Sequence, residues 1–528
     1  MIEGKNFIGY DKSAKGSITY QTVNPKLNMD NPWKFHQATP DEINEAVEKA
    51  GRSFSIYNQK TAKERALFLR KIAANIENLG DALIETYVNE SGLPQGRALG
   101  ERGRTINQLM AFADLLEEGS WVKATIETGG LTGDPGAKPD LRKMNVPIGP
   151  IVVFGASNFP LAFSTAGGDT ASALAAGCPV IVKSHPMHAG TSELVASAIS
   201  SAAQETDMPD GVFSHLNSKG IEVGELLIKH SLIKGVGFTG SRKGGMALYK
   251  MAAEREEPIP VFAEMGSVNP VVILPKAVSE KGKEWAKTLS GSINMGAGQF
   301  CTNPGLILGI AGDDLDQFGK ELSRELLSQE SSCMLHPNIA EAFHTGSRKM
   351  LDEKGVEMLA LEMENHGENH GRQALVKVNG TDFIENKRLH QEVFGPFSML
   401  VCCRDLEELT AIVNNLEGQL TGTVLAQQDE AQNYKPLIQA LSSRVGRIIF
   451  NNVPTGVEVC GAMQHGGPFP ASTDSRFTAV GVHAINRWVR PFAYQDWPSD
   501  LLPEALQDDN PLGILREVNG KWDTGKIN

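Results

Sequence analysis

The 528-residue sequence has few cysteines, no excess of positive charge and no long apolar run. Its six cysteines follow no regular spacing and form no zinc-like Cys/His cluster, which excludes a disulfide scaffold and predicts no structural metal. Lys and Arg number 50 against 63 Asp and Glu, and this acidic balance argues against binding nucleic acid or an anionic membrane. No apolar run reaches the length of about 18 residues that spans a membrane, and the first residues do not resemble a signal peptide. We therefore expect a cytoplasmic protein with reduced thiols.

Apolar residues and glycine, by contrast, are plentiful. Hydrophobic residues make up 41% of the chain, enough to bury a large core. The 54 glycines exceed the average share of about 7% and indicate many tight turns and close backbone approaches. At about 150 residues per domain, the length suggests roughly three domains, and the absence of an internal repeat excludes a solenoid or propeller.

The order of expected elements indicates two α/β domains in series. A polar, extended lead-in of about 30 residues precedes two helices, whose starts are marked by capping boxes at Thr39 and Thr61. A connector or edge ribbon is expected over 119–145, and after residue 146 short apolar runs alternate with helical patterns, as in a doubly wound parallel sheet. The expected strands are 151–154, 180–182, 233–238, 260–263, 271–274 and 306–310, and the expected helices are 164–176, 192–203, 242–254 and 283–295.

A glycine-rich segment follows the expected strand at 233–238. Gly235–Gly240 reads GxGxxG, a weak motif here because Gly237 falls inside the strand rather than in the following turn. Gly240 and Ser241 lie at the start of the next helix, whose backbone N–H groups could bind a phosphate. A helix-start turn without a ligand is the alternative.

Several polar residues could carry chemistry. Cys301 lies in the glycine-rich segment 296–305, which favours an accessible nucleophile over a small buried hydrophobic residue. Glu264 ends an apolar strand and could be a ribose ligand, a general base or a solvated strand end. Asn158, just beyond a strand, could donate to an oxyanion or only shape a turn, and Glu392 in Glu392–Pro396 is equally ambiguous.

Taken in order along the chain, these motifs resemble those of the aldehyde dehydrogenase superfamily, from about residue 20 to about residue 490. The resemblance implies that Asn158 and the backbone N–H of Cys301 form an oxyanion hole, that the Cys301 thiolate is the nucleophile, and that Glu264 is the general base. It also implies a set of cofactor contacts: Lys183 at the adenine ribose, Phe238, Gly240 and Ser241 at the pyrophosphate, and Glu392 with Phe394 at the nicotinamide ribose.

The fold implied by the resemblance has a Rossmann-like cofactor domain, a second α/β catalytic domain and a small β arm that builds a homodimer or homotetramer. The expected bounds are 1–124 and 148–265 for the cofactor domain, 266–475 for the catalytic domain, and 125–147 with 476–528 for the bridging segments and tail.

Departures from the family pattern narrow the assignment. Ala156-Ser157 replaces the usual Pro-Trp before the Asn, and Met265 and Ser267 interrupt the usual E-L-G-G. Pro186 stands where NAD-preferring members often carry a Glu, so NADP is expected over NAD, with Lys219 as a candidate phosphate partner. These features, with segments 452–460 and 465–470, are similar to the 2,5-dioxovalerate (α-ketoglutarate semialdehyde) dehydrogenase branch of the family.

The alternatives differ in substrate or in class. An NADP-dependent dehydrogenase of fatty or other aldehydes would use the same residues on a different small-molecule aldehyde. A CoA-acylating relative would lack a base such as Glu264, and a catalytically silent cofactor-binding homologue would tolerate loss of Cys301. Arg476 could pair with a substrate carboxylate, but it falls where the family has a structural arginine.

Overall fold

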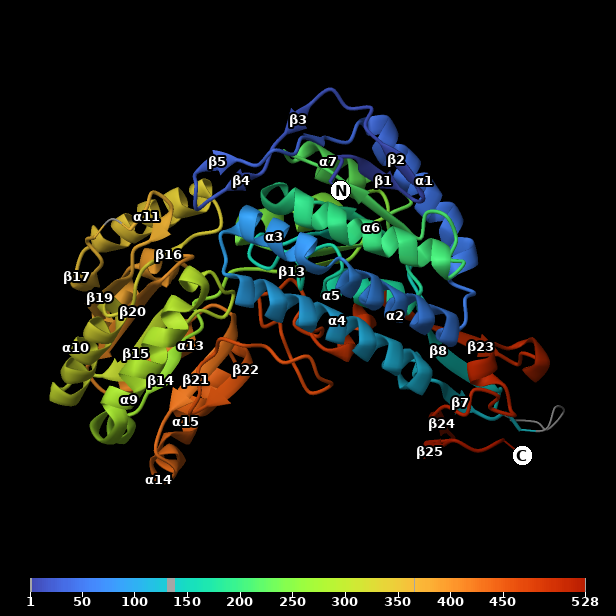
Figure 1. Cartoon of the computed structure of the whole chain (residues 1–528). Helices are drawn as coiled ribbons and strands as arrows, with labels where there is room; N and C mark the ends of the chain where they lie inside the picture. Colours follow the sequence, from blue (N-terminus) through green and yellow to red (C-terminus); the bar gives the residue numbers. More distant parts are fainter. Residues whose placement is uncertain (1, 131–137, 365, 528) are drawn as a thin grey trace.

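The computed structural model describes residues 2–130, 138–364 and 366–527, which form three large sheets with helices packed on two of them (Figure 1). The helices and strands before residue 265 form one half of the molecule, and the yellow and orange segments that follow form the other half. The third sheet lies beside the C-terminus, at the far side of the first half from the second sheet. This arrangement is the mixed α/β fold that the sequence predicts.

The first sheet is a doubly wound sheet extended by two antiparallel strands. The five strands from β13 to β11 are parallel, and the strand order reverses between β9 and β12, which is the topological switch point where such sheets bind ligands. In order, the strands are β13 (Val261–Glu264), β12 (Gly235–Thr239), β9 (Ile151–Phe154), β10 (Val180–Lys183), β11 (Phe213–Leu216), β1 (Asn6–Ile8) and β2 (Asp11–Ser13).

Helices cover both faces of this sheet because its strands are apolar on both sides. Val152 and Ile181 pack toward one group of helices, whereas their neighbours Val153 and Val182 pack toward the other. The first group is α1 (Pro40–Tyr57), α7 (Glu222–Lys229) and α8 (Arg242–Ala253); the second is α2 (Ala62–Asn78), α3 (Gly80–Ser91), α4 (Gln95–Glu118), α5 (Gly168–Ala176) and α6 (Ala189–Glu205).

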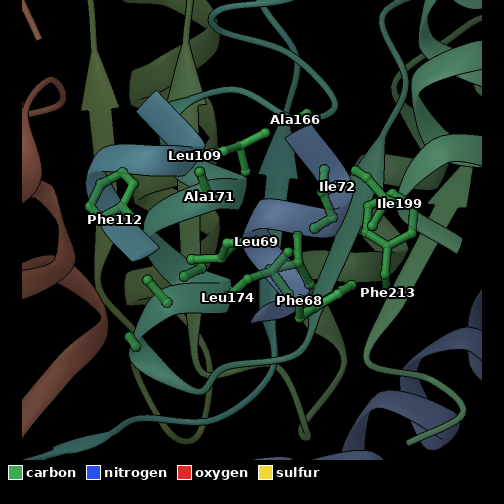
Figure 2. Packing of buried hydrophobic residues seen from close by; sticks show 14 of the residues in the cluster. Phe68, Leu69, Ile72, Leu109, Phe112, Ala166, Ala171, Leu174, Ile199 and Phe213 are labelled. Carbon is green, nitrogen blue, oxygen red and sulfur yellow. The ribbon is translucent and has the colours of Figure 1, made fainter. Parts of the chain in front are cut away.

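The largest core cluster lies between the second helix group and the sheet. Figure 2 shows Phe68 and Ile72 of α2 pointing into the space between α5, α6 and the strands. Phe68 and Phe112 are fully buried, and the small side chains of Ala166 and Ala171 let α5 approach its neighbours closely. This rigid block carries the loop that follows β9.

The second sheet is parallel except for one edge strand. Its order is β17 (Glu357–Leu361), β19 (Ala374–Asn379), β20 (Phe397–Cys403), β15 (Leu306–Ile310), β14 (Val271–Ile273), β21 (Gln419–Leu425) and β22 (Val445–Phe450). The helices that connect these strands are α9 (Pro275–Asn294), α10 (Asp313–Leu327), α11 (Pro337–Leu351), α12 (Gly380–Glu385), α13 (Leu406–Asn415), α14 (Gln428–Ala431) and α15 (Lys435–Ser442).

The third sheet joins two segments far apart in the sequence. Its order is β23 (Val489–Gln495), β8 (Leu141–Pro147), β7 (Thr125–Glu127), β24 (Arg516–Val518) and β25 (Lys521–Asp523). Residues 125–127 and 141–145 of the expected connector therefore form strands of this ribbon, and residues 131–137 of that segment lie outside the described part.

The local predictions are mostly confirmed, with two corrections. Both capping boxes form, and strands Ile151–Phe154 and Leu306–Ile310 have the predicted bounds. The prediction that the first 30 residues are a polar lead-in is wrong for β1, because this strand is fully buried and pairs with β11. The helix predicted from residue 164 begins only at Gly168, because the chain before it forms a loop held by α4.

The helices of the described part include none that is both long enough and apolar enough to cross a bilayer. The six cysteines are all free.

Candidate active site

The site lies where the carboxyl ends of the first sheet face the amino ends of the second. Glu264 ends β13 and Asn158 follows β9, whereas the loop that carries Cys301 precedes β15. A pocket of about 240 Å³ is lined by all three residues, together with Ser241 and Glu392 among others. The topology therefore gathers residues that are far apart in the chain.

Cys301 lies in an irregular loop after helix α9. The chain turns through Gly296, Ala297 and Gly298 with positive φ, and Ala297 at φ 55° occupies a left-handed conformation that is unfavourable for a residue with a side chain. The Cys301 side chain is half-buried, and its Sγ lies 3.6 Å from Nε2 of His465. The thiol is thus held against an imidazole on one side of the pocket.

Asn158 is positioned by a buried carboxylate on α4. Glu101 accepts hydrogen bonds from the backbone N–H groups of Leu161 and Ala162, both at 2.9 Å, and so fixes the loop after β9. The Asn158 Nδ2 donates one hydrogen bond to the carbonyl of Gln299 at 3.0 Å. An amide nitrogen has two donors, so the second N–H is left for a ligand.

Glu264 is buried at the end of β13, with 7% of its surface exposed. Its backbone pairs with Ser472, and its Oε2 has no hydrogen-bond partner in the described structure. Burial raises the pKa of this carboxyl well above its usual range; nearby Asp169 raises it further, and Arg487 opposes the shift. A carboxyl with a raised pKa and a free oxygen can accept a proton near neutral or alkaline pH.

The surroundings of Cys301 favour the protonated form of its thiol. Desolvation, together with the negative charges of Glu264 and Glu392, raises the pKa of the thiol to about 12, and the positive charge of Arg104 acts in the opposite direction. Forming the thiolate therefore needs a group that takes the proton or a ligand that changes this charge balance.

Three of the residues expected at a cofactor lie at the carboxyl ends of the first sheet. Lys183 ends β10, and burial lowers the pKa of its ammonium group to about 8, an effect that Glu222 opposes. Gly240 follows β12, and Ser241 caps α8 by accepting a hydrogen bond from the N–H of Gly244 at 3.2 Å. The exposed start of α8 also carries Arg242, whose guanidinium forms an ion pair with Glu417 at 2.8 Å. Phe238 packs edge to face on Phe154.

Glu392 and Phe394 approach this region from the second sheet. Both line the pocket that contains Cys301, in the segment that precedes β20. A Cβ on Gly266 would lie 2.3 Å from Oε2 of Glu392, so the glycine after Glu264 is what lets the Glu392 carboxylate approach. The Ser267 backbone N–H also faces this carboxylate.

Two residues singled out from the sequence lie elsewhere. Lys219 is exposed in a turn, where its backbone N–H binds Gln37, and no contact in the described structure joins its side chain to Lys183. Arg476 is exposed and forms an ion pair with Asp474, in accord with its structural interpretation.

The glycine motif at 235–240 is not a phosphate-binding turn at its second glycine. Gly237 lies inside β12, as its place in the sequence indicated. A side chain there would lie 2.6 Å from the carboxylate of Asp169, which forms an ion pair with Arg487, so Gly237 makes room for that pair.

Sequence reasoning gave no role to three residues near Cys301. His465 was noted only as the start of a short motif, and burial lowers its pKa to about 3, so its imidazole is neutral. Arg104 on α4 and Arg447 on β22 both act electrostatically on the thiol. No local pattern could have found them, since α4 precedes Cys301 by about 200 residues and carries other arginines. In the described part, no group of three His, Cys, Asp or Glu side chains is placed to hold a metal.

A comparison with protein families now defines the chain. The model of the aldehyde dehydrogenase family matches residues 12–486. The chain belongs to this family. Aldehyde dehydrogenases use NAD or NADP.

Two curated relatives match this aldehyde dehydrogenase over almost its full length. An α-ketoglutaric semialdehyde dehydrogenase 2 of Azospirillum brasilense is 45% identical, over 98% of this chain and 99% of the relative. An α-ketoglutaric semialdehyde dehydrogenase of Acinetobacter baylyi is 43% identical, over 98% of each chain. These relatives match the branch expected from the sequence.

Solved structures share the fold at lower identity. A betaine aldehyde dehydrogenase of Staphylococcus aureus in complex with NAD⁺ superposes with a TM-score of 0.80 at 18% identity, covering 94% of this chain and 97% of the other. A Thermus thermophilus 1-pyrroline-5-carboxylate dehydrogenase gives 0.80 at 19% identity, covering 94% and 93%.

We predict that alkylation of Cys301 by iodoacetamide is slow at neutral pH and accelerates about tenfold per pH unit between pH 7 and 9. The thiolate is the reactive form, and below a raised pKa its fraction increases tenfold with each unit. Glu264→Gln removes a negative charge that raises this pKa and should speed alkylation. Peptide mapping by mass spectrometry follows the reaction, with Cys301→Ala identifying the modified peptide, and a rate that does not change with pH would contradict the assignment.

Proposed function

We propose that this aldehyde dehydrogenase oxidises α-ketoglutarate semialdehyde (2,5-dioxopentanoate) to 2-oxoglutarate. The observation that carries the chemistry is the common pocket of Cys301, Asn158 and Glu264, which combines a nucleophile, an amide donor and a buried base. The substrate is supported by two relatives of that name at 45% and 43% identity. A fatty or other aldehyde is the second candidate, and the assay below distinguishes the two.

In the proposed mechanism Cys301 is the nucleophile. Its thiolate attacks the aldehyde carbon and forms a thiohemiacetal, whose oxyanion receives hydrogen bonds from the free Nδ2–H of Asn158 and from the Cys301 backbone N–H. The first of these donors is held in place by the bond from Asn158 to Gln299. Loss of one such donor typically lowers the rate by about 10²–10³.

The cofactor is held between the two sheet edges. Lys183, Gly240 and Ser241 would contact its adenosine and pyrophosphate portion, and Glu392 with Phe394 its nicotinamide end. The residues fit such a group, because the Lys183 ammonium has no ion-pair or hydrogen-bond partner in the described structure and the start of α8 is exposed and basic. A bound NAD(P) would supply the hydride acceptor for the substrate carbon, and Cys301 would then hold the acyl group as a thioester.

Glu264 completes the reaction by activating water. Its unpaired carboxylate oxygen takes a proton from water, the resulting hydroxide attacks the thioester carbonyl, and the Cys301 thiolate leaves as the carboxylate product forms. A base held in this way typically contributes about 10²–10⁴ to the rate. Hydrolysis by Glu264 also distinguishes this reaction from acyl transfer to CoA.

We propose NADP as the preferred cofactor. Pro186, three residues after Lys183, brings no carboxylate to the adenine ribose, so a 2′-phosphate would meet a lysine without an adjacent acid at that position. Glu222 is the acidic residue whose charge reaches Lys183.

We also propose that the chain forms a homodimer or homotetramer through its third sheet. Two strands, β23 and β25, are edges of this sheet, and Phe492 and Trp522 on them are 40% and 64% exposed. Exposed sheet edges with large apolar side chains favour pairing with another chain. Light scattering coupled to size exclusion should give two or four times the mass of 57.0 kDa, and a monomer would contradict the proposal.

For Glu264→Gln we expect a stoichiometric burst of NADPH with the semialdehyde, followed by a steady rate about 10²–10⁴ lower than that of the wild type. The amide cannot take a proton from water, but hydride transfer does not need it. Stopped-flow absorbance at 340 nm separates the two phases. Glu254→Gln, at the exposed end of α8, is the control. Loss of the burst itself, or an unchanged steady rate, would refute this role.

The substrate and cofactor are tested together by reduction of NADP and NAD in parallel. We expect rapid, Cys301-dependent reduction of NADP with the semialdehyde, and Pro186→Glu should lower the preference for NADP by at least tenfold, or about 1.4 kcal/mol, because a carboxylate repels the 2′-phosphate. Faster turnover of a long-chain aldehyde would overturn the substrate and keep the chemistry. No reduction with any aldehyde would favour the silent homologue.

A further inference from the structure

A line of side chains leads from helix α4 to the catalytic thiol. The guanidinium carbon of Arg104 lies 5.5 Å from the centre of the Phe163 ring. The Phe163 ring lies 6.1 Å from that of His465, whose Nε2 is 3.6 Å from the Sγ of Cys301. Arg104 therefore lies on the side of the thiol that carries His465, with the Phe163 ring between Arg104 and His465.

Arg104 differs from the other arginines of the same helix because it has no acidic partner. Arg97 contacts the Glu101 carboxylate at 3.4 Å and Arg102 contacts that of Glu77 at 3.0 Å, whereas Arg104 forms neither an ion pair nor a hydrogen bond with any described residue. Its Nε and Nη2 atoms are buried without a partner. Leaving a guanidinium desolvated and unpaired is unfavourable, so a position of this kind is retained where a ligand supplies the missing acceptor.

A second guanidinium approaches from the other half of the molecule. Arg447 on β22 donates to the carbonyls of Pro454 and Gly456 at 3.3 and 3.4 Å, and its Nε is also buried without a partner. The positive charges of Arg447 and Arg104 both act on His465, and each interacts favourably with the Cys301 thiolate. Two positive groups from two domains thus converge on one side of the thiol.

The acidic groups around Arg104 do not neutralise it. The Glu101 carboxylate is already occupied by Leu161, Ala162 and the hydroxyl of Tyr87. Glu458 attracts Arg104 at long range, but it is exposed and is not within ion-pair distance in the described structure. The side of the pocket beyond the thiol therefore has an excess of positive charge.

We infer that Arg104 binds the carboxylate at the far end of the substrate, with Arg447 adding positive charge near the thiol, and so selects aldehydes that carry a terminal acid. The inference deepens the proposed function and rests on its choice of a carboxylate-bearing aldehyde. The Arg104 fork offers two parallel N–H donors to a carboxylate, and the adjoining Phe163 ring packs against the carbon chain between the two ends. Arg447 adds charge and, through its bonds to the 454–456 carbonyls, positions the loop that closes this side.

The test compares paired substrates that differ only in the terminal acid. We expect Arg104→Met to raise KM about 10- to 100-fold for α-ketoglutarate semialdehyde and for 4-oxobutanoate, and to change kcat/KM for butanal by less than about threefold. Charge-assisted hydrogen bonds account for a loss of this size. Arg102→Met, which removes an equal charge from the same helix but from the pair with Glu77, should leave all three substrates unchanged.

Direct binding separates recognition from chemistry. Competitive inhibition by glutarate, a dicarboxylate without an aldehyde, should weaken in Arg104→Met by a factor similar to the rise in KM, and Arg104→Lys should recover part of it. Glu458→Gln should tighten glutarate binding, because a competing carboxylate is removed. A matching melting temperature for Arg104→Met and the wild type shows that the fold is kept.

The outcomes separate this inference from the proposed function. An equal loss for butanal and 4-oxobutanoate, or an unchanged glutarate affinity, would overturn the role of Arg104. If α-ketoglutarate semialdehyde is a poor substrate but 4-oxobutanoate still depends on Arg104 while butanal does not, the carboxylate subsite stands and the proposed substrate fails.

Discussion

The site depends on the fully buried amide of Asn269. Its Nδ2 donates to the carbonyls of Cys301 and Asn303, both at 2.9 Å, and its Oδ1 accepts from the hydroxyls of Ser267 and Thr421. One side chain therefore joins three pieces: the segment that leaves Glu264, the loop that carries the thiol, and strand β21. A buried amide without these partners would be strongly unfavourable, so the network fixes the loop that carries Cys301 relative to the segment that follows Glu264.

The Asn269 network holds the carboxyl ends of the strands in the first sheet against the amino ends of the strands in the second. In the first sheet ligand-binding residues follow strands, as Asn158 follows β9, because loops at the carboxyl ends meet at the switch point. In the second sheet they precede strands: Cys301 lies before β15 and Glu392 before β20. Neither sheet alone contains both the oxyanion donor and the thiol.

The sequence predicts structure well where the interacting residues lie close together in the chain. Capping boxes at Thr39 and Thr61 and the buried run at 151–154 depend on residues within a few positions of one another, and each is found where it was predicted. Local sequence patterns do not predict structure that depends on a residue far away in the chain. Glu101, some 60 residues earlier in the chain, holds the segment before α5 as a loop rather than a helix. Arg104 and His465 come near Cys301 only when the two halves of the molecule pack together. The family resemblance named the residues that we propose for the shared chemistry, but it gave no role to Arg104, Arg447 or His465 on the side of the thiol where we propose that the substrate carboxylate binds.

The charges around the thiol suggest why the side of the site near Arg104 and Arg447 is positive. Burial favours the protonated form of Cys301, so the thiol itself supplies little negative charge to balance the nearby guanidiniums. A carboxylate on the substrate supplies the missing charge at Arg104, where it does not enter the reaction. When this carboxylate binds, it cancels part of the positive field that stabilises the thiolate. The subsite therefore gains substrate selectivity but lowers the stability of the thiolate. The Asn158 side chain and the Cys301 backbone N–H must then stabilise the oxyanion without help from the arginines. Selectivity and nucleophile activation are therefore coupled through the same two side chains.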